Sequence, residues 1–83
     1  MANENMTPAQ EERVALLIRL AGEERPSAFL MPVRMADLHL LEVAAGLKNL
    51  DHAEAEDETV IGASSGQVWE LCRAADAAVK GGA

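Results

Sequence analysis

Apolar residues recur at helical spacing in three separate stretches of the chain. In the first stretch they lie three or four positions apart, at Val14, Leu17, Ile18 and Ala21. Thr7 and Gln10 have the spacing of a capping box, and Pro8 suits the first turn of a helix. Gly22 is a typical helix stop. The pattern predicts a helix over about 8–21.

The second stretch predicts a helix that starts near Pro32 or Val33 and runs to about Ala45, or as far as position 49. Its main apolar stripe consists of Val33, Ala36, Leu40, Val43, Ala44 and Leu47. Gly46 either caps this helix or lies within it. A stripe this broad is typical of a helix that contacts more than one neighbour.

The third stretch predicts a helix over about 65–80. Its apolar stripe consists of Val68, Leu71, Cys72, Ala75, Ala78 and Val79. Ser64 has the character of an N-cap, and Gln67 follows at capping-box spacing. Gly81 and Gly82 end the stretch.

The two connectors carry weaker signals. Pro26 and Pro32 bracket a segment that we expect to be a loop or a single turn, because each proline disfavours helix in the residue before it. Residues 51–63 form an acidic linker whose end, Thr59–Ile61, can extend briefly. The prediction is an all-α fold, a small three-helix bundle with an acidic loop between its second and third helices. Residues 1–83 then make a single small helical domain, with 1–6 as a frayed start.

Composition narrows the class of protein. The 83 residues carry 14 acidic and 7 basic side chains, a net charge of −7, and 49% of them are apolar. This length fits one small domain and excludes a multidomain enzyme. A single cysteine excludes a disulfide-stapled miniprotein. The acidic balance argues against direct nucleic-acid binding, which needs surplus Lys and Arg.

Targeting signals also bear on the expected location. The segment 1–10 has neither the basic cluster nor the apolar core of a signal peptide, and the apolar runs are too short to span a bilayer. We therefore expect a cytoplasmic protein without membrane contact. With one cysteine in the chain, no disulfide pair points to an oxidising compartment.

Candidate chemical groups all have a simpler structural interpretation. Cys72 lies on an apolar stripe and is expected to be a buried thiol rather than a nucleophile. His39 and His52 lack zinc-site spacing and are expected at the surface or rim. The acids of 51–58 do not fit a calcium loop. We therefore predict no catalytic residue, no metal and no cofactor, and hence no enzyme.

The segment from Ile61 to Leu71 resembles the prosthetic-group site of acyl carrier proteins over about eleven residues. The resemblance implies a serine at a helix start, here Ser65, as the attachment point of a phosphopantetheine arm. Ser64 stands where that family has an aspartate, and Gly66 where it has a bulky residue. A carrier is for this reason a minor alternative.

The function expected from the sequence is a small protein-interaction module (an adaptor, regulator or inhibitor) that binds another protein and acts as a homodimer. Broad apolar faces on a short chain motivate the dimer. The partner-binding residues expected are the two aromatic ones and the acids of the linker: Trp69, Phe29, Glu54, Glu56, Asp57 and Glu58. The alternative function is an acidic nucleic-acid mimic that blocks a basic groove of a defence or nucleic-acid-processing enzyme.

Overall fold

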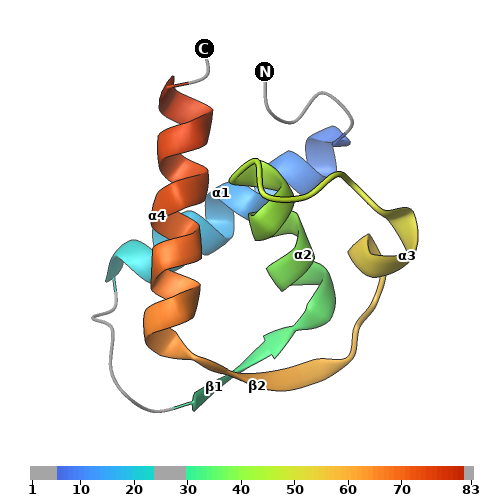
Figure 1. Cartoon of the computed structure of the whole chain (residues 1–83), viewed down its shortest axis with the longest axis vertical. Helices are drawn as coiled ribbons and strands as arrows, with labels where there is room; N and C mark the ends of the chain where they lie inside the picture. The colour runs from blue at the N-terminus through green and yellow to red at the C-terminus, as the bar shows by residue number, and fades with distance from the viewer. Residues whose placement is uncertain (1–5, 24–29, 82–83) are drawn as a thin grey trace.

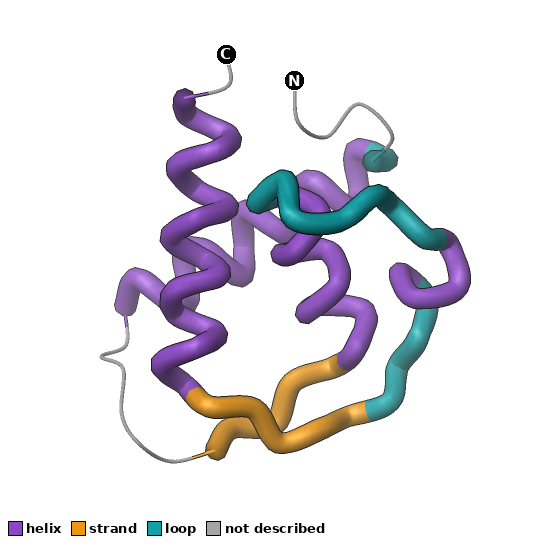
Figure 2. Tube along the Cα trace, viewed as in Figure 1, coloured by secondary structure: helices purple, strands orange, loops and turns teal. Residues whose placement is uncertain are grey.

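A two-stranded antiparallel sheet joins four helices in the part of the chain that this computed structural model describes, residues 6–23 and 30–81 (Figures 1 and 2). The elements in order are α1 (Pro8–Glu23), β1 (Leu30–Arg34), α2 (Met35–Ala44), α3 (His52–Ala55), β2 (Val60–Ser64) and α4 (Ser65–Gly81). The fold is therefore mixed α/β. Our prediction of an all-α three-helix bundle is wrong, because two segments assigned to a helix start and to a linker pair as strands.

The β-ribbon, β1 with β2, runs below the helices in Figure 1. Its register pairs Leu30 with Ser64 at one end and Arg34 with Val60 at the other. Pro32 does not start a helix, because it lies in the middle of β1. The fixed φ of proline suits extended backbone as well as the first turn of a helix. Pairing between strands so far apart in the sequence has no local periodic signal, and this is why the pattern missed it.

Two helix ends, the start of α1 and the end of α2, follow the capping chemistry of the sequence. Thr7 N–H donates to Gln10 Oε1 at 3.0 Å, and Gln10 N–H donates to Thr7 Oγ1 at 3.2 Å, which confirms the predicted capping box of α1. At the end of α2, Gly46 N–H donates to the Val43 carbonyl and Leu47 N–H to the Glu42 carbonyl. These two bonds are a Schellman motif, so Gly46 ends the helix.

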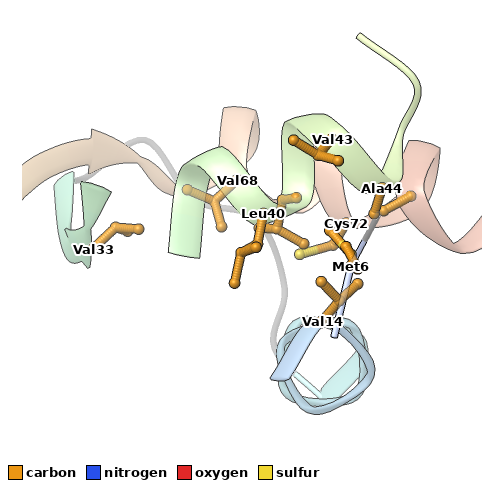
Figure 3. Close-up of a cluster of buried hydrophobic side chains, with 10 residues drawn as sticks. Met6, Val14, Val33, Leu40, Val43, Ala44, Val68 and Cys72 are labelled. Carbon is orange, nitrogen blue, oxygen red and sulfur yellow. The ribbon is translucent and has the colours of Figure 1, made fainter. Parts of the chain in front are cut away.

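The core lies where α2 is enclosed by α1 and α4. Figure 3 shows Leu40 of α2 near Cys72 of α4, with Val14 of α1 pointing toward Cys72 and Met6. Leu41 is 1% exposed and Ala44 and Ala75 are fully buried. Met6, which we expected in a frayed start, is 7% exposed and belongs to this core. Residues 1–5 lie outside the described residues.

The acidic segment 51–58 is built into the fold instead of forming a plain loop. Asp51 caps α3 by accepting hydrogen bonds from Ala53 N–H and Glu54 N–H. The carbonyls of Asp57 and Thr59 accept from the first two N–H groups of α2, Ala36 and Met35, each at 2.8 Å. The segment thereby satisfies donors that the start of α2 would otherwise leave unpaired.

Gly46 gives a test of the α2 end. Its φ is +79°, which an alanine adopts at a cost of about 1 kcal/mol. We expect Gly46→Ala to lower the free energy of unfolding by about that amount in a urea titration. Gly81→Ala is the matched control, because Gly81 is the last residue of α4 and has open space around it. This substitution should leave the free energy of unfolding unchanged or slightly higher.

Candidate functional site

An apolar groove of about 400 Å³ lies where α1, β1 and α4 meet. Leu41 of α2 contributes to its lining, and Leu20 and Val60 are 49% and 59% exposed. One face of each flanking helix reaches it, supplying Arg13, Leu17, Leu20 and Ala21 from α1 and Ser65, Val68, Trp69 and Cys72 from α4. Because Arg13 and Arg34 also line it, we call it the arginine-rimmed groove.

A three-residue ion cluster stands in this groove. Arg13 donates to Asp37 through Nε and Nη2, at 3.0 and 2.8 Å. Arg34 donates to the same carboxylate through Nε and Nη2, at 3.2 and 2.9 Å. Such bidentate pairs fix both distance and orientation. The cluster therefore ties α1 and the end of β1 to the first turn of α2.

The charges of the cluster do not balance, because two guanidinium groups pair with one carboxylate. Burial raises the pKa of Asp37, but the paired guanidinium groups outweigh burial and hold that pKa below its ordinary value. The hydrogen bonds to Asp37 raise the pKa values of Arg13 and Arg34. Two cations thus share one buried anion. Glu58 Oε1 lies 3.8 Å from Arg34 Nη1, but its side chain is 81% exposed, so it compensates the second charge only weakly.

Trp69, predicted as a partner contact, lines this groove and is half-buried. The Arg73 guanidinium lies 4.7 Å from the centre of its ring, in cation–π geometry. The indole therefore forms part of the groove wall and also contacts a cation. Phe29, the other aromatic residue predicted as a contact, lies outside the described residues.

Cys72 is buried, as the apolar stripe predicted. Burial raises the pKa of its thiol, and Sγ lies 3.8 Å from the Leu17 carbonyl. A thiol in this setting stays protonated and is a poor nucleophile. We expect N-ethylmaleimide to label Cys72 about 100-fold more slowly in the native protein than in concentrated urea. Intact mass spectrometry follows the labelling. Equal rates in the native and the urea-unfolded protein would show that the thiol is accessible in the fold.

His39 is a structural residue that sequence reasoning placed wrongly, at the surface or rim. Its side chain is 3% exposed, and Nε2 accepts a hydrogen bond from Asp51 N–H at 3.0 Å. Its Nδ1 lies 2.8 Å from Glu54 Oε2, although the angle is not that of a hydrogen bond. Because Nε2 accepts, the network assigns the ring proton to Nδ1, facing that carboxylate.

The acids predicted as partner contacts do not gather at one site. Glu54 faces His39, and Glu58 reaches toward Arg34. Asp57 Oδ1 accepts from Thr59 N–H at 2.9 Å, and the hydrogen bonds from Thr59 lower the pKa of Asp57. Glu56 is exposed and follows α3 as its C-cap. Three of these four acids thus have partners within the fold, and only Glu58 approaches the arginine-rimmed groove.

Other candidate chemistry is sparse in the described part of the chain. No group of three or more His, Cys, Asp or Glu side chains among residues 6–23 and 30–81 has the arrangement of a metal site. Ser65, the residue suggested by the carrier resemblance, is the first residue of α4 and also lines the groove.

Sequence reasoning missed the residues that define the groove, Arg13, Arg34 and Asp37. One local signal was the spacing of Arg34 and Asp37, three positions apart at a helix start. A charged Asp37 beside the apolar stripe of α2 also hinted at a buried partner, because carboxylates are almost never fully buried unless paired. Arg13, which is 24 positions away, had no such signal.

Comparison of the chain with protein-family models, with curated proteins and with solved structures gives no match. No helix within the described ranges is both long and apolar enough to cross a membrane.

Proposed function

We propose that this protein is a protein-interaction module that receives an apolar segment of another protein in the arginine-rimmed groove. The observation that carries the proposal is the groove itself, which combines an apolar lining with two guanidinium groups and half-exposed aliphatic side chains. Concave apolar surfaces with a few fixed polar groups are typical of binding sites. Aromatic residues such as Trp69 are enriched where interfaces bind most tightly.

The charges of the groove favour a partner segment that carries a carboxylate. Arg13 and Arg34 share Asp37 as their buried counter-ion, and Glu58 is mostly exposed. A carboxylate from the partner can replace Glu58 and complete a two-to-two arrangement. The net charge of −7 opposes an acidic segment only weakly here, because salt screens charges farther away than about 8 Å.

The states of the polar groups favour binding over reaction chemistry. Asp37 has a lowered pKa and both of its oxygens are engaged, so it is a poor general base. Cys72 has a raised pKa. The open rim also favours a polypeptide over a small amphiphile, which needs to bury most of its surface.

Three further expectations belong to this proposal. The homodimer stays a prediction, supported by exposed Leu20, Leu30, Leu47, Val60 and Val79, and light scattering at micromolar concentration tests it. A cytoplasmic location stays a prediction. The nucleic-acid mimic remains the alternative, supported by the acidic balance, and salt-insensitive partner binding would count against it.

Selection of short peptides from a random display library tests the proposal. We expect the bound peptides to combine bulky apolar residues with Asp or Glu, and to shift the emission of Trp69, the single tryptophan of the chain. Leu20→Asp should weaken binding at least about tenfold, because it removes an apolar contact at the rim and places there a charge that repels the carboxylate of the partner. Leu47→Asp is the matched control, since Leu47 is 65% exposed and outside this groove, and it should bind as the wild type does.

Two outcomes would overturn the proposal. One is equal loss of binding in the Leu20 and Leu47 variants, which would point to nonspecific apolar contact. The other is a laurate titration that shifts Trp69 emission as strongly as the best peptide, which would assign the groove to a free amphiphile.

Arg34→Gln should reduce binding of acidic peptides while sparing their amide counterparts.

A further inference from the structure

The backbone of β2 has a free edge on the side away from β1. Met35 N–H donates to the Thr59 carbonyl, which continues the register one pair beyond Arg34 and Val60. Hydrogen-bonded and non-hydrogen-bonded pairs alternate along an antiparallel ladder. It follows that Ile61 and Ala63 direct their backbone groups toward β1, whereas Val60 and Gly62 direct theirs outward.

Nothing in the described part of the chain pairs with this outer edge, because the sheet there has two strands. Val60 and Gly62 are also exposed. Free strand edges are templates for another strand, and native proteins protect them with proline or charge. The outer edge of β1 has such protection, since Pro32 is in the outward-facing set and lacks an N–H group. The five residues of β2, Val60–Ser64, contain neither proline nor a charged side chain.

A second groove, of about 670 Å³, borders the same edge. Four consecutive residues of β2, numbers 61–64, line it together with apolar residues of α2 and α4, namely Leu38, Val68, Leu71 and Ala74. Leu30 and Leu47, which are 70% and 65% exposed, stand at its margins. Its described charged residues are both acidic, Glu42 and Glu70, so we call it the acid-rimmed groove.

The residues at the rims of the two grooves therefore carry charges of opposite sign. Lys48 Nζ lies 3.5 Å from Glu42 Oε1 and compensates that side chain in part. Glu70 is exposed, and Glu56, Asp57 and Glu58 lead into β2. An extended segment beside β2 would alternate its side chains between the acid-rimmed groove and the outer face, where the Leu30 side chain lies over Gly62.

We infer that β2 accepts an added strand from another protein, and that this strand alternates apolar with basic residues. Main-chain hydrogen bonds to Val60 and Gly62 supply pairing. The Lys or Arg side chains, on one face of the added strand, reach Glu42 and Glu70 in the acid-rimmed groove, and the apolar side chains of the other face cover the exposed Leu30 side chain. This site adjoins the arginine-rimmed groove, because Val60 lines that groove and Val68 lines both grooves. It binds a segment of the opposite charge, so either proposal can fail while the other stands.

A short capped peptide that alternates valine and lysine tests this inference against the full ¹⁵N-labelled chain. We expect amide shifts and slowed hydrogen exchange at Val60 and Gly62, with little change in Trp69 emission. The same peptide with N-methyl groups on alternate residues keeps its side chains but loses one pairing edge, and it should not bind. A valine–glutamate peptide should also fail to bind.

Protein variants separate the backbone from the charge contribution. Gly62→Pro removes an outward N–H, and we expect about tenfold weaker binding. Glu42→Gln with Glu70→Gln removes the acidic rim and should weaken binding about tenfold at physiological salt. Glu11→Gln with Glu12→Gln is the matched control, with the same change in net charge on exposed positions of α1. Circular dichroism checks that each variant is folded.

The inference is overturned if the N-methylated or the valine–glutamate peptide binds as well as the valine–lysine peptide. It is also overturned if no peptide binds, or if the amide shifts map to residues outside β2 and the acid-rimmed groove. A further result that contradicts it is concentration-dependent protection of Val60 and Gly62 in the protein alone. That result would assign the edge to a second copy of this chain.

Discussion

Replacing Asp37 with asparagine is expected to lower the free energy of unfolding by about 2 kcal/mol at neutral pH. The variant keeps the shape of the side chain but removes the charge that Arg13 and Arg34 share. Removing one partner of a fully buried ion pair lowers stability by more than this. Here both arginine side chains are over a third exposed, so water solvates them and offsets part of the loss. For a domain of this size the melting temperature should fall by roughly 10 °C.

The pH dependence of the same variant separates charge from packing. The pKa of Asp37 is lower in the folded protein, so its ionisation stabilises the fold above its unfolded value of 3.8. That contribution is lost as the pH falls below 3.8 through the folded value. Wild-type melting temperature should therefore fall more steeply than that of Asp37→Asn as the solution is acidified. Asp76→Asn is the control, because its pair with Lys80 is exposed and should be worth less than about 1 kcal/mol.

Replacing His39 with alanine is expected to lower the free energy of unfolding by about 3 kcal/mol. The substitution leaves a cavity beside α2 and removes the acceptor of Asp51 N–H. Urea unfolding measures the global effect. Amide hydrogen exchange at Asp51 and Glu54 measures whether α3 separates first, since His39 holds the start of that helix.

His52→Ala is the matched control for His39. His52 is exposed and begins α3, so its loss should change stability by less than about 0.5 kcal/mol. Equal stability of the two variants would contradict the role assigned to His39. A large global loss without faster exchange at Asp51 would show that His39 acts by packing alone.

The helices and the ribbon differ in how far the sequence could predict them. The helix predicted over 8–21 is confirmed as α1, and the one predicted over 65–80 is confirmed as α4, because apolar spacing and capping residues act locally. The predicted start of α2 near Pro32 or Val33 is wrong, since both residues belong to β1 and the helix begins at Met35. A proline that can open a helix can equally lie in an edge strand, and only its distant partner Gly62 decides between the two.

The candidate site was harder to predict than the helices for a related reason. The prediction for Trp69 rested on its residue type, whereas the arginine-rimmed groove depends on how α1 and α4 meet across β1. The acids at 54–58 looked like one solvated run in the sequence. In the fold, Glu54 turns to His39 and Glu58 toward Arg34, so neighbours in the chain serve different contacts.

We propose that the arginine-rimmed groove holds a carboxylate-bearing apolar segment of another protein. Nuclear Overhauser effects between a display-selected peptide and the methyl-labelled protein show directly whether the peptide lies there. We expect contacts from the apolar residues of the peptide to the Leu17, Leu20 and Val60 methyl groups and to the Trp69 indole. Contacts confined to Leu47 or Val79, which lie outside this groove, would contradict it.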